Sequence, residues 1–261
     1  MIKIGLIGCG RISGNHFKAI KEHKDRCKLV AVCDIIEERA RTAGSENGCN
    51  YYTSLNQMLK DENLDLVSIC TPSGLHPEHG IKVAKAGVHV LTEKPIGINI
   101  AEVDRLIKTC DEENVNLFVV KQNRLNATMQ ALKKAIDKGR FGKIYMVQSN
   151  VFWQRPQEYY DSAKWRGTWE FDGGAFMNQA SHYVDMLYWL VGDVDYVMAS
   201  TATMARHVET EDTGAAIIKF RNGAIGTMSV TMLAYPKNFE GSITILGEKG
   251  TVRVGGIAIN K

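Results

Sequence analysis

The sequence predicts an α/β fold made of two domains, a doubly wound parallel sheet first and an α+β domain with a mostly antiparallel open sheet second. Three observations lead to this fold class. Short apolar runs alternate with helical patterns over the first 120 residues, and longer segments with strand-like alternation follow. The composition changes as well, because all 6 cysteines lie in the first 110 residues and all 4 tryptophans lie in the second half.

The N-terminal half contains apolar runs that are rich in Val and Ile and lack a clean alternation with polar residues. Such runs are typical of strands buried on both faces of a parallel sheet. We expect strands over Ile2–Ile7, Leu29–Cys33, Leu66–Cys70, Val88–Leu91 and Leu117–Val120. Helical spacing predicts helices over Ile12–Glu22, Glu37–Ala43, Ser54–Leu59, Pro77–Ala86 and Asn99–Glu113. Repeated strand-helix-strand units indicate a doubly wound domain, which we assign to residues 1–121.

The second domain, residues 122–261, is richer in long strands. Its expected strands are Lys143–Trp153, Tyr196–Met204, Gly214–Phe220, Ala224–Thr231 and Ser242–Leu246. Helices are expected over Thr128–Lys138 and Asn178–Leu190, and the second is amphipathic, so that it can cover one face of the sheet. The turn at residues 221–223 predicts a hairpin. The chain stops within the strand-like residues 257–261, and we expect a further C-terminal segment in the full protein.

The composition argues against several functional classes. With 44% hydrophobic and 23% charged residues and a formal net charge of +3, the chain gives no reason to expect a nucleic-acid partner. The N-terminus lacks the features of a signal peptide, and no run of about 18 uncharged apolar residues is present to span a membrane. We therefore expect a cytoplasmic protein with reduced cysteines. No group of His, Cys and Asp has the spacing of metal ligands, so we expect no metal.

A glycine-rich segment follows the first expected strand and opens the first expected helix. Residues 8–13, GCGRIS, fit the dinucleotide-binding fingerprint of a Rossmann domain, with serine at the third glycine position. Gly8 permits the tight turn, Gly10 lets a pyrophosphate approach the backbone, and the helix N-terminus offers free N–H groups. Asp34, at the end of the second strand, is placed to bind ribose hydroxyls and favours NAD over NADP. The alternative is a glycine turn that is needed only for packing.

The segment 71–73, Thr-Pro-Ser, ends another expected strand of the parallel sheet. Because ligands bind beyond the carboxyl ends of such strands, this loop should flank the nicotinamide side of the cofactor. His16, His76 and His79 lie nearby, and each of them alone is more often structural or solvated than catalytic. The residues that we expect to bind the cofactor are Gly8, Gly10, Arg11, Ile12, Asp34, Thr71, Pro72, His76 and Glu93.

A charged pair, Glu93 and Lys94, ends the apolar strand before Pro95. Charge at the end of a buried strand is costly unless something there needs it. Lys94 would reach the same rim as the glycine loop, where a lysine can donate a hydrogen bond to a substrate hydroxyl. It can also stabilise the alkoxide that develops as hydride leaves the carbon. The alternative is an ion pair on the surface.

A second candidate site lies in the segment Asp172–Asp185. Asn178 and His182 are four residues apart, so on one helix they would share a face, and Asp185 is placed to orient the histidine ring. A histidine that titrates near neutral pH can take a hydroxyl proton while hydride departs. A lone helical histidine is otherwise more often a core residue.

Aromatic and basic residues gather between the two candidate sites. They are Trp153, Arg155, Tyr159, Tyr160, Trp165, Arg166 and Trp169. Such a loop can cover a sugar ring and bind an acid or a phosphate. The same residue types are typical of an oligomer contact, and the sequence leaves both interpretations open.

These segments together resemble the glucose-fructose oxidoreductase/inositol dehydrogenase (Gfo/Idh/MocA) family. The resemblance covers the whole chain and is carried by GCGRIS, TPSGLH, EKP and GGAFMNQASHYVDMLYWL. It implies an N-terminal NAD(P)-binding domain, a C-terminal sheet used to form dimers or tetramers, and catalytic roles for Lys94 and His182. Many members have an aspartate four residues before this histidine, where this chain has Asn178, so acid-base work would concentrate on Lys94 and His182.

Further segments are similar to a bacterial group within that family, the UDP-N-acetyl-2-amino-2-deoxy-glucuronate 3-dehydrogenases of surface-polysaccharide (lipopolysaccharide) synthesis. They are VVKQNR, VFWQRPQEYYD, WRGTWEFDGG and TEDTGAAI. This implies NAD-dependent oxidation of the C3 hydroxyl of an anionic sugar nucleotide, UDP-N-acetyl-glucosaminuronic acid, to the 3-keto sugar. The expected substrate contacts are Lys94, Arg124, Tyr159, Trp165, Arg166, Asn178 and His182. Two alternatives stay open, an NAD-dependent dehydrogenase of a free polyol or aldose and a non-catalytic NAD(H)-binding regulator.

Overall fold

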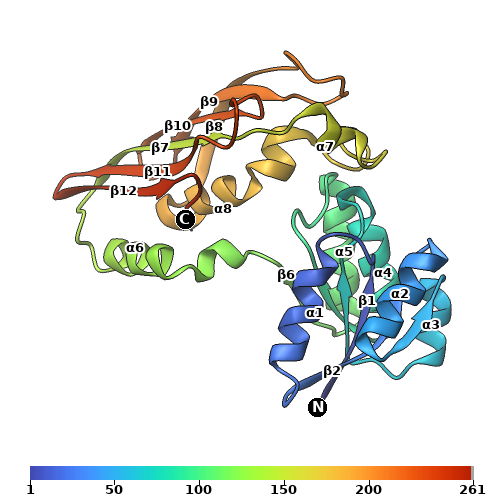
Figure 1. Ribbon diagram of the computed structural model, residues 1–261. Helices are drawn as coiled ribbons and strands as arrows, with labels where there is room; N and C mark the ends of the chain where they lie inside the picture. The colour runs from blue at the N-terminus through green and yellow to red at the C-terminus, as the bar shows by residue number, and fades with distance from the viewer. Residues whose placement is uncertain (260–261) are drawn as a thin grey trace. The chain divides into compact units, whose positions relative to one another are not determined.

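The computed structural model describes residues 1–259 and divides into two compact units, Met1–Val120 and Lys121–Lys261 (Figure 1). Each unit has its own sheet and its own hydrophobic core. Among the described residues, no helix is long and apolar enough to cross a membrane.

The N-terminal unit is built on a parallel six-stranded sheet with the strand order β3-β2-β1-β4-β5-β6. Its strands are β1 (Ile2–Ile7), β2 (Cys27–Cys33), β3 (Asn50–Tyr52), β4 (Leu66–Ile69), β5 (His89–Thr92) and β6 (Leu117–Val119). Its helices are α1 (Ser13–Glu22), α2 (Glu37–Asn47), α3 (Leu55–Asp61), α4 (His76–Lys85) and α5 (Ile100–Glu112). The strand order reverses at β1, as in a Rossmann fold, whose ligands bind at the carboxyl ends of the strands around that point. The predicted doubly wound fold is confirmed.

Burial on both faces explains the continuous apolar runs of these strands. Leu6 of β1, Val67 of β4 and Val90 of β5 are all completely buried. Phe17 of α1 packs into the core cluster that contains Leu6, whereas Leu106 of α5 belongs to a second cluster with Val67 and Val90. Each such side chain contributes about 1.5–3 kcal/mol through its burial, so the sheet is held between helices on both sides.

The five strands predicted for this half are present, and their ends differ from the predicted ones by at most two residues. Strand β3 was not predicted; it is a three-residue strand at the sheet edge whose residues are exposed or half-buried. An edge strand needs little apolar character, and the pairing of Val32 with Tyr51 and of Cys33 with Tyr52 defines it. Its short length left no periodic pattern to detect.

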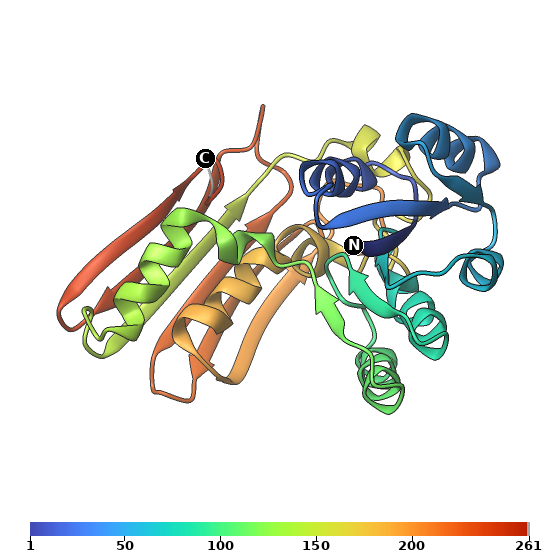
Figure 2. The ribbon, with the colours of Figure 1, turned by 90° about the horizontal axis from the view of Figure 1, so that it is seen from below.

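The C-terminal unit is built on a mixed six-stranded sheet with the order β12-β11-β7-β10-β9-β8. Its strands are β7 (Ile144–Phe152), β8 (Val194–Ala202), β9 (Thr213–Phe220), β10 (Ile225–Thr231), β11 (Glu240–Gly247) and β12 (Gly250–Gly256). Neighbouring strands run antiparallel except β7 and β10, which are parallel. Helices α6 (Ala127–Asp137) and α8 (Ser181–Val191) lie on the same face of the sheet (Figure 2). The predicted mostly antiparallel sheet is confirmed.

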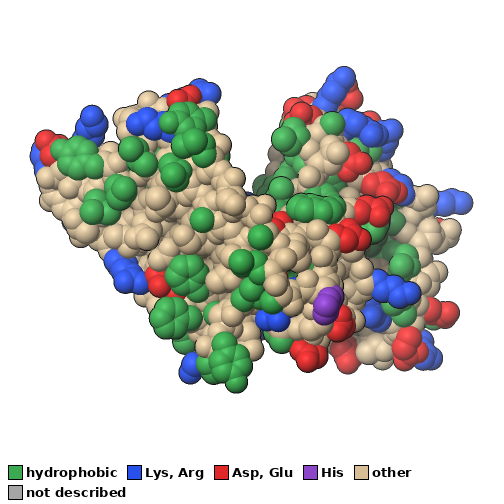
Figure 3. All heavy atoms as spheres, turned by 90° about the horizontal axis from the view of Figure 1, so that it is seen from above, with side chains coloured by type: hydrophobic (Ala, Val, Ile, Leu, Met, Phe, Trp, Pro, Cys, Tyr) green, Lys and Arg blue, Asp and Glu red, His purple; other side chains and the backbone are tan. Residues whose placement is uncertain are grey.

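One face of this sheet is covered and the other is open. Tyr183 and Met186 of α8 and Met129 of α6 are at most 1% exposed and pack on the inward side chains of the strands. On the outer face, Met198 and Ile217 are cross-strand partners, and each is about half exposed. Figure 3 looks onto this outer face, where apolar side chains stand among mostly uncharged polar ones. The uncovered face therefore offers a broad surface of low charge.

The helix predicted over Asn178–Leu190 starts later than expected. α8 begins at Ser181, and a π-helical turn, Ala175–Gln179, precedes it. Gly173 and Gly174 have φ of +79° and +95°, so the chain enters this turn from a backbone conformation that favours glycine. Asn178 consequently lies on the irregular turn, and the regular helix begins only at Ser181.

Two further elements were not predicted. A short helix, α7 (Gln157–Asp161), lies in the segment expected to be an aromatic and basic loop. Strand β12 contains three glycines and pairs along its length with β11, an arrangement that strand propensity does not favour. Of the strand-like residues 257–261, Ile257 to Ile259 follow β12 without regular structure, and residues 260 and 261 lie outside the described part of the chain.

Candidate active site

Gly8 and Gly10 are glycines for different reasons. Gly8 has φ +92°, and a Cβ built there would lie 2.7 Å from the Cys70 carbonyl group, so the fold itself requires glycine. Gly10 is exposed, and a Cβ there would meet no described atom within 4 Å. Packing therefore does not explain Gly10, whereas the close approach of a pyrophosphate would.

Asp34 is fixed at the end of β2 beside the glycine loop. Its carboxylate accepts hydrogen bonds from the Cys9 N–H at 2.8 Å and from the Ile36 N–H at 2.9 Å, and the residue is 8% exposed. The Gly8 N–H donates to the Cys33 carbonyl at 2.8 Å. Each carboxylate oxygen keeps a second lone pair, so Asp34 can still accept ribose hydroxyls.

Helix α1 begins without a capping side chain among residues 1–259, and its first turn carries no acidic residue. Ser13 donates its hydroxyl to the Gly10 carbonyl at 2.6 Å and so closes the loop. Arg11 is exposed and Ile12 is half-buried at the same place. Uncapped N–H groups at the positive end of a helix dipole suit phosphates. These residues therefore fit a dinucleotide, which the loop, the start of α1 and Asp34 would hold.

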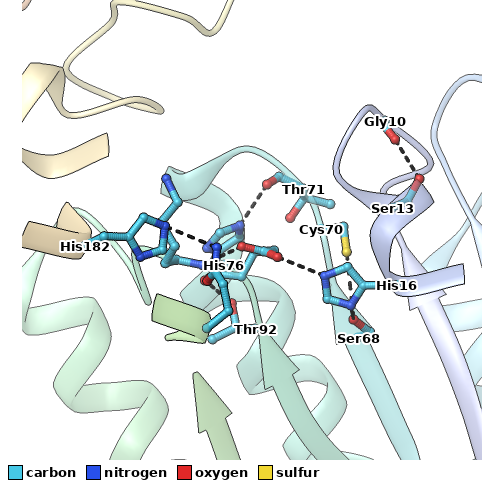
Figure 4. Close-up of polar contacts among 12 residues, drawn as sticks. Gly10, Ser13, His16, Ser68, Cys70, Thr71, His76, Thr92 and His182 are labelled. Carbon is cyan, nitrogen blue, oxygen red and sulfur yellow. Dashed lines mark hydrogen bonds and ion pairs between the residues drawn. The ribbon is translucent and has the colours of Figure 1, made fainter. Parts of the chain in front are cut away.

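His76, which was predicted to bind the cofactor, has a different place in the structure. It is 1% exposed, and its Nδ1 and Nε2 lie 2.7 Å from the Pro95 carbonyl oxygen and 2.8 Å from the Thr71 carbonyl oxygen (Figure 4). Burial lowers the pKa of His76 more than the two carbonyl groups raise it. His76 thus joins the loop after β4 to the turn after β5, with both ring nitrogens directed at backbone rather than at a ligand.

Thr71 and Pro72 lie at the rim as expected from the topology, and both are half-buried. The Thr71 hydroxyl is 3.0 Å from Nδ1 of His79. Burial lowers the pKa of His79 to about 4, so this ring is neutral at pH 7. The loop after β4 is therefore held by two histidines of α4.

Glu93 and Lys94 follow β5 at the same rim. Glu93 is 7% exposed, and its carboxylate accepts hydrogen bonds from Nε2 of His16 at 2.9 Å and from the Lys94 N–H at 3.1 Å. Burial would raise the pKa of Glu93, but these donors and the charge of Lys94 outweigh it, and the net shift is downward. Lys94 is half-buried, and its peptide bond to Pro95 is cis. The partner of Glu93 is therefore a histidine of α1.

The second candidate site is a buried polar segment of the C-terminal unit. Asp172 is 3% exposed and accepts hydrogen bonds from the Gly167 N–H at 2.7 Å and from the Asn178 side-chain amide. His182 is 9% exposed in the first turn of α8, and its Nε2 lies 3.4 Å from the Gln122 amide nitrogen. The acid near Asn178 is thus Asp172, which belongs to the preceding loop.

Asp185, which was predicted to orient His182, is held by a different side chain. Its two carboxylate oxygens accept hydrogen bonds from Nε and Nη2 of Arg124 at 2.8 and 2.7 Å, and Lys121 lies 3.8 Å away. Arg124 also stacks over Trp189, with 5.7 Å from its guanidinium carbon to the ring centre. Asp185 and Arg124 therefore form a bidentate ion pair that joins the first residues of the C-terminal unit to α8. Arg124 was predicted as a substrate contact, and in the structure it binds Asp185.

The aromatic and basic residues form a compact cluster. The Arg166 guanidinium lies over the Tyr159 ring at 4.2 Å and over the Trp165 ring at 4.8 Å. Stacking of this kind holds a guanidinium in place while leaving its N–H groups to face other partners. Tyr159, Trp165 and Arg166, which were predicted together as part of one aromatic and basic loop, are therefore in contact with one another.

Gln179 links this cluster to the segment that carries His182, and the sequence analysis did not single it out. Its amide nitrogen donates to the Tyr159 hydroxyl at 2.8 Å, and its amide oxygen accepts from Nε of Arg155 at 3.0 Å. Gln179 lies three residues before His182. In the sequence, only its position next to Asn178 in the segment GGAFMNQASHYVDMLYWL indicates that Gln179 could belong to the site.

Two buried acids that the sequence analysis also missed hold the neighbouring loop. Glu211 accepts the Phe176 N–H at 2.9 Å, and burial raises the pKa of its carboxyl group. Asp212 is completely buried and accepts the N–H groups of residues 204–206 at 2.9–3.0 Å. Burial would raise the pKa of Asp212, but these backbone donors bring it below its usual range. Within residues 1–259, no group of three or more His, Cys, Asp or Glu could hold a metal ion.

Two family profiles match the chain. Residues 2–121 match the oxidoreductase family with the NAD-binding Rossmann fold, and residues 129–253 match the GFO/IDH/MocA C-terminal domain. Together these two matches cover most of the chain.

Several known proteins are similar along nearly all of the chain. WlbA dehydrogenases from Chromobacterium violaceum and Bordetella pertussis, solved in complex with NADH and UDP-GlcNAcA, are 57% and 60% identical. Both have a TM-score of 0.98, and the match covers 100% of this chain and 75% of theirs. Myo-inositol 2-dehydrogenase from Thermotoga maritima is 29% identical over 96% of this chain and 74% of its own.

Proposed function

Because the chain belongs to the Gfo/Idh/MocA oxidoreductase family, we propose that it is an NAD-dependent dehydrogenase of UDP-N-acetyl-glucosaminuronic acid (UDP-GlcNAcA). The reaction oxidises the C3 hydroxyl to the 3-keto sugar, within the synthesis of a bacterial surface polysaccharide in the cytoplasm. The observation that carries this proposal is the identity of 57% and 60%, over the whole chain, to WlbA dehydrogenases solved with NADH and UDP-GlcNAcA.

The glycine loop supports NAD as the cofactor. Gly10 leaves open space where a side chain would fit, the start of α1 presents uncapped N–H groups, and Asp34 is an acid placed for ribose hydroxyls. When bound, NAD supplies the hydride acceptor. The roles of the remaining residues are to hold the two molecules and to handle the hydroxyl proton.

Lys94 acts on the reacting hydroxyl in this proposal. It follows β5 at the carboxyl rim of the parallel sheet, and its backbone N–H is tied to Glu93 at 3.1 Å. The Lys94 ammonium group donates a hydrogen bond to the hydroxyl and stabilises the negative charge that grows on the oxygen as hydride leaves. The bond to Glu93 fixes the backbone from which this side chain extends.

His182 accepts the hydroxyl proton. Its Nε2 faces the Gln122 amide nitrogen, an arrangement in which Nε2 carries the lone pair and accepts. A neutral imidazole with a lone pair is the form that a general base needs. Asn178 would contact the substrate on the turn before α8, where Asp172 holds its amide.

The cluster around Arg166 binds an anionic part of the substrate in this proposal. Among the described residues, the buried Nε of Arg166 has no hydrogen-bond acceptor, and its guanidinium is stacked between Tyr159 and Trp165. Such an arginine suits a carboxylate or a phosphate. Gln179 ties the cluster to the segment of His182, which favours substrate binding over an oligomer contact for this cluster.

The variant Arg166→Gln tests this role. It should raise KM for UDP-GlcNAcA roughly tenfold or more through the loss of a charge-assisted hydrogen bond, whereas Arg140→Gln at an exposed position should leave KM unchanged. An equal KM for both variants would remove Arg166 from the substrate site.

Dimers or tetramers formed through the open sheet face are part of the proposal. The outer face carries half-exposed apolar side chains, including Tyr196, Met198 and Ile217, on a surface of low charge. Native mass spectrometry of the chain measures the assembly. Replacement of Met198 and Ile217 by lysine should yield monomers, since charge on such a face opposes its burial.

A dehydrogenase of a free polyol is the second candidate. The 29% identity to myo-inositol 2-dehydrogenase from Thermotoga maritima favours it, although this identity is about half of that to the WlbA dehydrogenases. A non-catalytic NAD(H)-binding regulator is the third candidate function. A regulator that does not catalyse hydride transfer would not need both Lys94 and His182.

A substrate panel distinguishes these functions. Enzyme in amounts equal to NAD is mixed with UDP-GlcNAcA, UDP-GlcNAc, myo-inositol or glucose, and NADH absorbance is followed through a single turnover. The proposal predicts NADH with UDP-GlcNAcA and little with the others. Oxidation of inositol or glucose alone would establish the second function, and NADH binding without turnover of any sugar would establish the third.

A further inference from the structure

A line of polar side chains joins helix α1 to the turn that carries Lys94. Nε2 of His16, on α1, lies 2.9 Å from Oε1 of Glu93, and its Nδ1 lies 2.9 Å from the Ser68 hydroxyl (Figure 4). The His16 and Glu93 side chains are only 13% and 9% exposed. His16 is thus held on both sides within the N-terminal unit.

The hydrogens along this line can be assigned. Glu93 has a lowered pKa, so it is ionised and can only accept, which places a hydrogen on Nε2 of His16. When Nε2 carries the only ring hydrogen, Nδ1 accepts from the Ser68 hydroxyl. Burial raises the pKa of Cys70 to about 12, so its thiol keeps the hydrogen and can donate to Ser68 over 3.8 Å. Every donor in the line therefore has an acceptor.

Glu93 links His16 to the backbone of Lys94. One carboxylate oxygen is taken by His16, and the other accepts the Lys94 backbone N–H at 3.1 Å. A carboxylate held at both oxygens cannot rotate without breaking one of the two hydrogen bonds. The position of the Lys94 backbone is therefore set, through Glu93, by a residue on α1.

We propose that His16 is a positioning residue that, through Glu93, fixes the turn of Lys94 relative to the helix whose N-terminus receives the cofactor phosphates. His16 lies one turn into α1, whose start the glycine loop forms. The hydrogen bonds then fix the position of the turn that carries Lys94 relative to helix α1. This inference rests on the proposed dehydrogenase function, and it adds a role for a residue that the reaction itself does not touch.

Three variants test the proposal by kinetics. His16→Ala removes the donor, His16→Gln keeps an amide N–H that can reach Glu93, and Asn15→Ala is a matched control at an exposed position on the same helix. We expect His16→Ala to lower kcat roughly 10- to 100-fold, since small misplacements of a catalytic group have effects of this size. The Kd for NADH should change by less than about threefold, and His16→Gln should recover part of kcat.

A double-mutant cycle separates positioning from a general contribution to folding. If His16 acts through Glu93, His16→Ala should have little further effect on kcat in a Glu93→Gln background. Equal fold-losses in both backgrounds would overturn the proposal. So would a loss of kcat that His16→Ala shares with the Asn15→Ala control, or one explained by the unfolded fraction measured at the assay temperature.

The titration of Glu93 gives a second readout. The groups that face Glu93 are His16 of α1, Cys70 after β4, His76 of α4 and its own neighbour Lys94. His16 lowers the pKa of Glu93, so its removal should raise that pKa, and a titration of the Glu93 carboxyl group followed by carbon-13 NMR measures the pKa in wild type and in His16→Ala. An unchanged pKa of Glu93 in His16→Ala would contradict the proposal.

Nitrogen-15 NMR of the histidine rings gives a readout that does not depend on the substrate. The wild-type chain should show His16 with hydrogen on Nε2, and Glu93→Gln should alter that signal. A His16 ring without hydrogen on Nε2 would overturn the proposal. A wild-type chain with the expected ring signal but no turnover of UDP-GlcNAcA would instead count against the proposed function alone.

Discussion

The two units hold their candidate functional residues in different ways. In the N-terminal unit the glycine loop, Asp34 and Lys94 follow the ends of parallel strands, and backbone N–H groups hold the acids. In the C-terminal unit Asn178 lies on a π-helical turn and His182 at the start of a helix, and side chains from other segments contact both. The first arrangement follows from the topology of the sheet, and the second depends on individual long-range contacts.

The contrast has a consequence for mutation. Residues placed by backbone geometry, such as Asp34, tolerate the loss of neighbouring side chains. Residues placed by side-chain contacts, which are Asn178 and, through Glu93 and His16, Lys94, depend on each partner. Variants in the two units should therefore separate into those that change chemistry alone and those that also loosen the structure.

The largest effect is expected for Lys94→Ala. The variant should lower kcat roughly 10³-fold, because the donor to the developing alkoxide is lost, and it should leave the Kd for NADH nearly unchanged. Steady-state kinetics and NADH fluorescence titration measure the two quantities, with Lys85→Ala at an exposed position as the matched control. A parallel loss of NADH binding would assign Lys94 to the cofactor instead.

The next effect is expected for His182→Gln. It should lower kcat about 10²-fold through the loss of the general base, and it should flatten the acid side of the pH profile of kcat. His23→Asn, an exposed histidine of the N-terminal unit, is the control. A variant that keeps the wild-type acid limb would show that another group takes the proton.

Stability of the C-terminal unit should depend on Asp212. Asp212→Asn should reduce the free energy of unfolding by about 2–3 kcal/mol, because buried backbone donors lose a charged acceptor. The pKa of Asp212 is lowered in the fold, so its contribution is present above the unfolded pKa of about 4 and is lost as pH falls through the folded value. Urea unfolding at neutral and acid pH measures the difference, with Asp195→Asn on the exposed strand β8 as control. A difference that does not shrink at acid pH would contradict the assignment.

The smallest effect separates two glycines of one loop. Gly10→Ala should weaken NADH binding about tenfold and leave urea unfolding unchanged, because its Cβ meets only open space in the fold. Gly8→Ala should lower the free energy of unfolding by about 2 kcal/mol or more, because φ is positive and the Cβ would clash with the backbone at Cys70. Unchanged NADH binding in Gly10→Ala would mean that the cofactor does not approach this residue.

The signals that predict the N-terminal rim are local in the sequence. A glycine pair between a strand and a helix, and an acid at the end of the next strand, can be located without knowledge of tertiary contacts. The role of His76 could not be predicted in this way. The contact of its ring with Thr71 and Pro95 depends on how two loops meet after folding.

The C-terminal site was harder to predict for the same physical reason. A helical register assumed for Asn178 placed it on one face with His182, but the glycines before it produce a π-helical turn. Asp185 was close to His182 in sequence, yet a bidentate arginine from residue 124 takes its carboxylate. Side-chain pairing over such distances leaves no periodic trace in a single sequence.

The most direct test of the proposed reaction uses UDP-GlcNAcA deuterated at C3 of the sugar. In a single turnover with NAD, we expect the deuterium to appear in NADH, where mass spectrometry of the cofactor detects it. Substrate deuterated at C4 should give unlabelled NADH. Transfer of the label from C4, or formation of NADH without the C3 label, would contradict oxidation of the C3 hydroxyl by this protein.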